Sequence, residues 1–213
     1  MTQKKSPSSK QNIALFDFDE TLIEDDSLLL FQHALLGKTK TYLSFFQALF
    51  LAIIHHLKGS SKGEDFKGSV KAEWIYLTMR HQPLEHVKKL AESIASQLTW
   101  KTSIVQKLQS HAANGDHIVI ATGALSIFIK QIINKKVPYD AILSTEMEVK
   151  DAKLTGLIKG YNCVRKRKAE AIQNYLKTYG PFNTIYAYGN LPSDRYMLDL
   201  ADVAEVIPTK YKI

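Results

Sequence analysis

The stretch IALFDFDET, residues 13–21, joins a run of strand-forming apolar residues to two closely spaced acids, Asp17 and Asp19. A short apolar run of this kind is typical of a strand buried on both faces of a parallel sheet. Ligands of open parallel sheets bind at the carboxyl ends of the strands. We therefore expect residues 13–16 to form a buried strand, with a functional site at its carboxyl end.

The rest of the chain alternates in a way that predicts an α/β fold. A long helical stretch follows the first strand, with helices expected at 27–37, 40–59, 69–80 and 83–98. Helices and short strands then alternate, with helices expected at 102–116, 124–136, 168–180 and 193–202, and strands at 117–123, within 139–160, at 184–190 and at 203–208. This order predicts a three-layer, Rossmann-like core with a mainly parallel sheet, into which a helical unit is inserted after the first strand. The expected division is a disordered tail at 1–11, a core at 12–25 and 99–213, and a helical unit at 26–98.

Composition narrows the class of protein. The chain has 213 residues, enough for one domain with an insertion, and a net charge of +7. Its one cysteine, Cys163, excludes an intrachain disulfide and fits a reducing compartment, and the polar N-terminus lacks the apolar core of a signal peptide. We therefore expect a cytoplasmic protein. The positive charge favours anionic partners such as nucleic acid, an acidic membrane surface or phosphorylated small molecules.

The longest uncharged apolar stretch is residues 41–57. It is about 17 residues long, at the lower limit for a membrane span, and it contains Thr, Ser, Gln and two His. Three interpretations stay open: a buried helix, a helix that lies in a membrane interface, and a true span. Peripheral membrane contact through 41–57 is therefore one expectation.

Polar groups follow three of the expected strands, and we expect them to converge at one sheet edge. Paired carboxylates bind a hard cation through oxygen or divide nucleophilic and acid/base work. A hydroxyl and a bare backbone N–H at a strand-to-helix junction favour an anion. With a lysine added, such a set makes a phosphoryl-transfer site. The residues concerned are Asp17, Asp19, Thr122, Gly123, Gly189, Asn190 and Asp194.

Four ordered motifs resemble the haloacid dehalogenase superfamily, in the subfamily of phosphoserine phosphatases and C-type phosphatidylglycerophosphate phosphatases. The first, Asp-x-Asp-x-Thr after an apolar strand, is LFDFDET with Asp17, Asp19 and Thr21. The second is IVIATG with Thr122, and the fourth is YGNLPSD with Asn190 and Asp194. The third is GYNCVRKRK, in which the family spacing selects Lys168 rather than Lys166.

The resemblance implies a phosphatase that uses Mg²⁺ and an aspartyl-phosphate intermediate. Asp17 would attack phosphorus, and Asp19 would protonate the leaving alkoxide and then take a proton from water. Thr21 would orient the loop between them. Thr122, the Gly123 N–H and Lys168 would hold the other phosphoryl oxygens.

The resemblance also implies that Mg²⁺ binds the Asp17 carboxylate, the Asp19 carbonyl oxygen, Asn190 and Asp194. Asn190 departs from the aspartate that many relatives carry, so the implied metal site has one negative charge fewer. The helical unit at 26–98 would be a cap over the site.

Two cap positions bear on the substrate. Phosphoserine phosphatases place a Glu nine residues after the nucleophile, where this chain has Asp26, and an Arg in the cap, where alignment places Glu73. An anion cannot hold a substrate carboxylate, so this alignment argues against phosphoserine. With the apolar stretch at 41–57, it favours a small organic or lipid-linked phosphate.

Two other classes of function stay open. The first is a non-catalytic phosphate- or lipid-binding module on the same fold, although Asp17 and Asp19 are both intact. The second is a basic nucleic-acid binder, which we do not expect because no aromatic residues interleave with the basic run at 165–168. The expected partner is a phosphorylated small-molecule or lipid substrate, and the sequence leaves the oligomeric state open.

Overall fold

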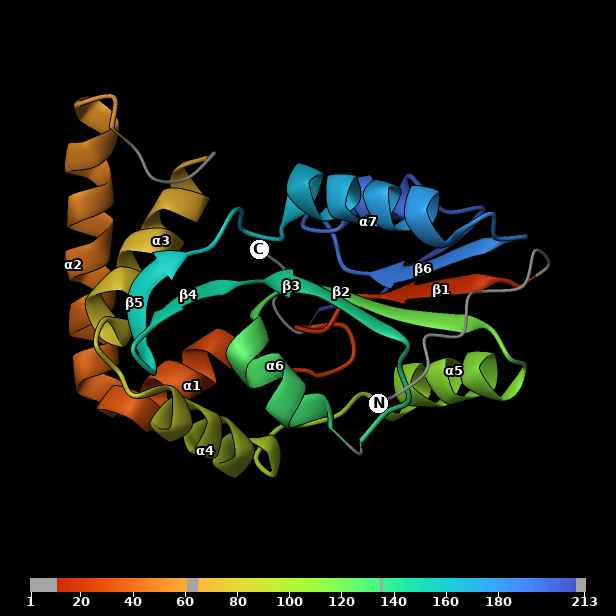
Figure 1. Cartoon of the computed structure of the whole chain (residues 1–213), viewed down its shortest axis with the longest axis horizontal. Coiled ribbons are helices and arrows are strands. Elements are labelled where there is room, and N and C mark those ends of the chain that lie inside the picture. Colours follow the sequence, from red (N-terminus) through yellow and green to blue (C-terminus); the bar gives the residue numbers. More distant parts are fainter. Residues whose placement is uncertain (1–10, 61–64, 135, 210–213) are drawn as a thin grey trace.

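The computed structural model describes residues 11–60, 65–134 and 136–209 (Figure 1). All but the last residue of the tail expected at 1–11 lies outside these ranges. Within them the chain forms a parallel sheet between two layers of helices, and a group of helices at one end of the sheet. The expected α/β class with a three-layer core is confirmed.

The sheet has five strands in the order β3-β2-β1-β6-β7, and every neighbouring pair is parallel. Its central strand is β1, which is completely buried and pairs with both β2 and β6. The opening apolar run is therefore the middle of the sheet. The strand bounds are β1 Ile13–Phe16, β2 His117–Leu125, β3 Ala141–Thr145, β6 Ile185–Gly189 and β7 Val203–Val206.

Alternate residues of β1 pack against opposite helical layers. Ile13 and Leu15 pack with Ile172 in one hydrophobic cluster, on the face covered by α7 and α8. Ala14 and Phe16 belong to a second cluster, on the face covered by α5 and α6. This alternation follows from the two-residue period of a strand. The helix bounds are α5 Thr102–Ala113, α6 Ser126–Ile133, α7 Arg165–Tyr179 and α8 Arg195–Leu198.

Capping residues mark where the helices of the insertion begin and end. Asp26 accepts a hydrogen bond from the backbone N–H of Leu29 (2.9 Å), and Gly37, with φ of 77°, separates the first two helices. Asp65 caps the third helix, which begins three residues earlier than predicted from the apolar pattern. No helix in the described ranges is long and apolar enough to cross a membrane. The helices are α1 Ser27–Leu36, α2 Lys38–Leu57, α3 Phe66–Met79 and α4 Leu84–Ala95.

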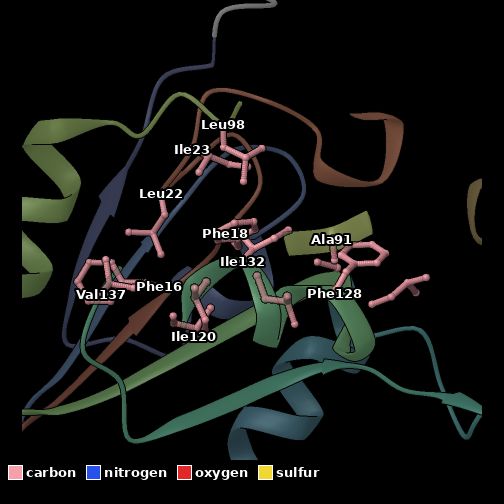
Figure 2. Close-up of a cluster of buried hydrophobic side chains, with 14 of the residues drawn as sticks. Phe16, Phe18, Leu22, Ile23, Ala91, Leu98, Ile120, Phe128, Ile132 and Val137 are labelled. Carbon is pink, nitrogen blue, oxygen red and sulfur yellow. The ribbon is translucent and has the colours of Figure 1, made fainter. Parts of the chain in front are cut away.

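One hydrophobic cluster joins the insertion to the sheet. Ala91 of α4 lies beside Phe128 and Ile132 of α6, in the same cluster as Phe18 and Leu22 from the loop after β1 (Figure 2). The helical unit thus has no separate core on this side. The division of the chain into a core and a helical unit at residues 26 and 98 stays a prediction. Helix α4, which lies in the helical unit, packs in the same hydrophobic cluster as the core.

The hairpin of β4 (Met147–Lys150) and β5 (Lys153–Ile158) stands apart from the main sheet. It is antiparallel and turns at Asp151 and Ala152, within the range 139–160 where the sequence predicts strands. The backbone of Leu154 accepts a hydrogen bond from His81 N (2.8 Å) and donates one to Gln82 O (2.9 Å), so the hairpin is attached to the end of α3. Although it lies in the stretch assigned to the core, it packs against the inserted helices.

Candidate functional site

Three acidic or amide side chains gather where β1 and β6 end. Asp17 is the first residue after β1, and its backbone N–H donates to the carbonyl of Tyr188 in β6 (3.0 Å). Asn190 is the first residue after β6, and Asp194 follows four residues later. Because the two strands are parallel neighbours, their carboxyl ends place these groups at one edge of the sheet.

Lys168 joins these groups from the first turn of α7. Its Nζ lies 2.7 Å from Asp17 Oδ1 and 2.6 Å from Asp194 Oδ1. All three residues are buried. Lys166, the other candidate, is exposed and extends over the ring of Tyr196. One lysine therefore bridges two carboxylates that enter the site from different strands.

The loop between β6 and α8 folds back on itself to place Asp194. Asp194 Oδ2 accepts the backbone N–H of Asn190 (2.9 Å), while Oδ1 faces Lys168. A Cβ on Gly189 would lie 2.7 Å from Asp194 Cβ, which is too close for any side chain. Gly189 is therefore required by this close approach.

The loop after Asp17 is held by hydrogen bonds to its neighbours. Thr21 Oγ1 donates to Asp17 Oδ2 (3.2 Å), and the expected role of Thr21 in orienting this loop stays a prediction. Asp19 Oδ1 accepts the backbone N–H of Ser27 (2.8 Å), and the Asp19 carbonyl accepts Asn190 Nδ2 (3.2 Å). Asp19 is thus tied to the start of α1 on one side and to the β6 loop on the other.

Thr122 and Gly123 lie differently from the prediction. Strand β2 continues to Leu125 and α6 begins at Ser126, so Gly123 does not lie at a helix N-terminus, and the argument that a helix start favours an anion there was wrong. The pairing register between β2 and β3 shifts after Ala121. Gly123 lies in this irregular part of the strand and lines the cavity of the site. Thr122 is fully buried, and its hydroxyl accepts the Ala124 N–H (3.0 Å).

A second lysine, Lys71 of α3, enters the site from the inserted helices. Its Nζ donates to the Gly123 carbonyl (2.7 Å) and to Asn162 Oδ1 (2.9 Å). The sequence alignment had placed Glu73 here, and that placement was wrong, because Glu73 instead pairs with His55 of α2 (2.8 Å). Helical geometry directs residues two apart to different faces, so the helix phase of α3 decides which one meets the site.

The gathered groups line a cavity of about 240 Å³. Asp17, Asp19, Asn190, Asp194 and Lys168 line it from the core, and Lys71, Asp26 and Leu28 line it from the insertion. Val164 separates it from a larger cavity of about 530 Å³ between α3, the hairpin and the start of α7. A Cβ on Gly123 would lie 2.7 Å from Val164 Cγ1, so these two residues pack closely between the cavities.

Burial disturbs the ionisation of the site. It raises the pKa of Asp17 to about 7, an effect that Asp194 reinforces and Lys168 opposes. Burial, together with the charge of Asp26, raises the pKa of Asp19 to about 7. Burial also lowers the pKa of Lys71 to about 8. In contrast, Asp17 and Asp194 raise the pKa of Lys168 enough to outweigh its burial, so this lysine stays charged.

These shifts predict that the metal-free protein loses stability as the pH rises from about 4 to about 7. The ordinary pKa of 3.8 makes Asp17 and Asp19 ionised in the unfolded chain across this range, while the folded protein keeps their protons until about pH 7. The folded state binds more protons there, so the free energy of unfolding falls by about 1.4 kcal/mol per pH unit from Asp17 alone. Urea unfolding in EDTA at a series of pH values measures this slope.

Asp17→Asn is the control for this slope, because the variant cannot bind the extra proton. It should flatten the dependence of unfolding free energy on pH. A slope that is unchanged in Asp17→Asn, or a wild-type stability that rises through this range, would contradict the assignment.

The donor set fits a hard divalent cation. Three carboxylates, Asp17, Asp19 and Asp194, exceed the positive charge of Lys168, and the Asp19 carbonyl and Asn190 add neutral oxygens of the kind that Mg²⁺ accepts. The described residues hold no cluster of three or more His, Cys, Asp or Glu arranged for a metal, so such a site depends on these neutral oxygens. Asn190 directs its Nδ2 toward the Asp19 carbonyl, so its amide has to turn over to offer oxygen beside that carbonyl.

Known proteins resemble this chain over most of its length. The model of the haloacid dehalogenase-like hydrolases matches residues 14–199. The phosphoserine phosphatase of Haemophilus influenzae (strain ATCC 51907 / DSM 11121 / KW20 / Rd) is 24% identical over 127 residues, which are 59% of this chain and 40% of that protein. The aligned part thus spans less than half of that relative.

Solved structures share the fold. A protein of unknown function from Bordetella pertussis Tohama I has a TM-score of 0.72 at 21% identity, over 92% of this chain and 90% of that one. A phosphoserine phosphatase determined as a phospho-aspartyl intermediate analogue has a TM-score of 0.65 at 21% identity, over 92% of this chain and 86% of that one. At this identity the likeness establishes the fold.

Proposed function

Because the chain belongs to the haloacid dehalogenase-like hydrolase family, we propose that it hydrolyses phosphate monoesters through an aspartyl-phosphate on Asp17. The observation that carries this proposal is the buried contact of Lys168 with both Asp17 and Asp194 at the sheet edge. A lysine in this place can offset the negative charge of the two carboxylates and also that of an incoming phosphoryl group.

Asp17 would be the nucleophile. One of its carboxylate oxygens attacks phosphorus, the bond from phosphorus to the ester oxygen breaks, and the electron pair leaves with that oxygen. Oδ1 contacts Lys168 and Oδ2 accepts a hydrogen bond from Thr21, so the carboxylate is fixed in orientation before substrate binds. Orientation of this kind removes part of the entropic barrier to attack.

Asp19 would move the proton. Its raised pKa of about 7 lets it hold a proton near neutral pH and give it to the departing alkoxide. The same carboxylate then removes a proton from the water that attacks the acyl phosphate, which releases phosphate and regenerates Asp17. The bond from Ser27 N–H to Asp19 Oδ1 leaves Oδ2 for this exchange.

Mg²⁺ would be held by Asp17, the Asp19 carbonyl, Asn190 and Asp194. When bound it would neutralise the excess carboxylate charge of the site and the charge of the phosphate. Asn190 supplies a neutral ligand, so the bound cation keeps more of its positive charge than it would with a third carboxylate. Lys168 and the backbone of Gly123 would contact the phosphoryl oxygens from the other side.

The substrate would be a small organic or lipid-linked phosphate whose leaving group meets Lys71 and Asp26. These residues bring one cation and one anion to the cavity from the insertion. A leaving group with an ammonium and a carboxylate fits such a pair, so phosphoserine, the substrate named for the Haemophilus influenzae relative, returns as a candidate. The larger cavity beyond Val164 offers room for longer leaving groups.

Hydrolysis of p-nitrophenyl phosphate tests the reaction class. We expect release of p-nitrophenol that stops in EDTA and returns when excess Mg²⁺ is added. A screen of phosphoserine, lysophosphatidic acid and phosphatidylglycerophosphate under the same conditions then ranks the leaving groups. Phosphate binding without turnover of any of these esters would instead favour the non-catalytic module.

A further inference from the structure

The outer face of α2 is an apolar stripe that the fold leaves uncovered. Phe46 and Phe50 are each 63% exposed and Leu57 is 81% exposed. The stripe consists of Tyr42, Leu43, Phe46, Phe50, Ile53 and Leu57. From Leu43 onward these residues are three or four apart, and Tyr42 is four before Phe46, so the side chains share one side of the helix. A contiguous exposed apolar surface of this kind marks an interaction site.

The packing of α2 turns this stripe away from the rest of the molecule. The small residues Ala48 and Ala52 are fully buried on the opposite side, where α2 packs against α3. The large apolar residues therefore point outward and the small ones inward, which is the reverse of a helix that packs its apolar face on a core. In Figure 1, α2 forms the outer edge of the molecule, with α3 between it and the hairpin.

Two side-chain contacts fix α2 in this orientation. Trp74 of α3 donates its Nε1–H to Ser44 of α2 (2.9 Å), and His55 of α2 pairs with Glu73 of α3 (2.8 Å). The contacts leave α3 from two adjacent residues and reach α2 at two places eleven residues apart. The stripe they orient is about 22 Å long, from the rise of 1.5 Å per residue between Tyr42 and Leu57.

Charge decides between possible partners. The sequence contains no Asp or Glu between Asp26 and Glu64. Exposed lysines stand at both ends of the stripe, Lys38 and Lys40 before it and Lys58 after it. An apolar face flanked by cations, on a helix that does not span a bilayer, has the composition of a helix that lies in the interface of an anionic membrane.

We propose that the outer face of α2 docks the protein on anionic lipid bilayers, with the helix axis in the membrane plane. The apolar stripe enters the boundary between headgroups and acyl chains, and the three lysines contact lipid phosphates. The α3 helix, which carries Lys71, lies between this face and the cavity, so docking holds the enzyme at the surface without covering the site. This inference does not depend on the proposed reaction.

Vesicle sedimentation tests the proposal with the full-length protein. We expect it to bind vesicles of equal parts phosphatidylglycerol and phosphatidylcholine and to stay in solution with phosphatidylcholine alone. The double variant Phe46→Ser/Phe50→Ser should bind the anionic vesicles about tenfold or more weakly, because it removes two exposed rings that enter the bilayer on docking. Lys38→Gln/Lys40→Gln should weaken binding by about fivefold per lysine, an effect that high salt abolishes.

Matched controls separate docking from charge and from folding. Lys130→Gln/Lys177→Gln removes two exposed lysines from α6 and α7 and should bind vesicles as the wild type does. All variants should keep the wild-type melting temperature and rate on p-nitrophenyl phosphate. Equal binding to neutral and anionic vesicles, or loss of a dimer in Phe46→Ser/Phe50→Ser with no vesicle binding in the wild type, would overturn the proposal.

Discussion

Asp17→Asn is expected to lower kcat on p-nitrophenyl phosphate by roughly 10⁴-fold or more. The amide has nearly the shape of the carboxylate but cannot form an acyl phosphate, so the first chemical step is lost. The substitution removes the nucleophilic carboxylate, which lies 2.7 Å from Lys168, and leaves the other substrate-facing groups in place. Steady-state kinetics with Mg²⁺ present measures the loss.

The same variant should not be less stable than the wild type. Burial already raises the pKa of Asp17 to about 7, so the site accepts a neutral group at little cost. Lys168 keeps Asp194 as its partner at 2.6 Å, which leaves one buried cation with one buried anion. A melting temperature equal to or above that of the wild type in EDTA at pH 8 would agree with this reasoning.

Asp199→Asn is the matched control for Asp17→Asn. It removes an exposed carboxylate that pairs loosely with Arg195 at 4.0 Å, outside the cavity. It should keep wild-type kcat. Substantial turnover by Asp17→Asn, or an acyl phosphate found by mass spectrometry on another residue after acid quenching, would remove Asp17 from its proposed role.

The strand-end residues could be predicted from the sequence because strand ends in a parallel sheet converge by topology. Residues 13–16 form the central strand, and Asp17 and Asn190 then line the same cavity because β1 and β6 are neighbours. Lys168 was separated from Lys166 by motif spacing, and the structure places it between two carboxylates. These features depend on short, regular pieces of chain.

The residues that sequence reasoning placed wrongly depend on local irregularity and helix phase. The extension of β2 to Leu125 follows from a register shift against β3, which no apolar pattern reveals. Whether Lys71 or Glu73 faces the site depends on the rotation of α3 about its axis. An alignment error of two residues therefore reverses the charge expected in the site. The α2 stripe points outward because the opposite side of the helix packs closely at Ala48 and Ala52. The number of apolar residues in α2 does not by itself show whether these side chains are buried or exposed.

Lys168→Met is expected to destabilise the metal-free protein by about 3–5 kcal/mol at pH 8, as well as to remove activity. Lys168 is 3% exposed and faces two buried carboxylates, so its loss leaves both without their cation. Methionine keeps most of the length of the side chain, which makes the lost charge the main difference. The deficit should shrink at lower pH, because Asp17 can then take up a proton and become neutral. Urea unfolding at pH 5 and pH 8 in EDTA measures both values.

A double variant separates the electrostatic role of Lys168 from its packing. Lys168→Met/Asp17→Asn removes one of the two stranded carboxylates, so it should recover part of the stability lost in Lys168→Met while activity stays absent. The coupling between the two sites should be large because their atoms lie 2.7 Å apart. If the effects of the two substitutions on the free energy of unfolding simply add, the contact contributes little, and Lys168 holds the site by packing. If stability returns in part, the charge of Lys168 is what maintains the two carboxylates at the sheet edge.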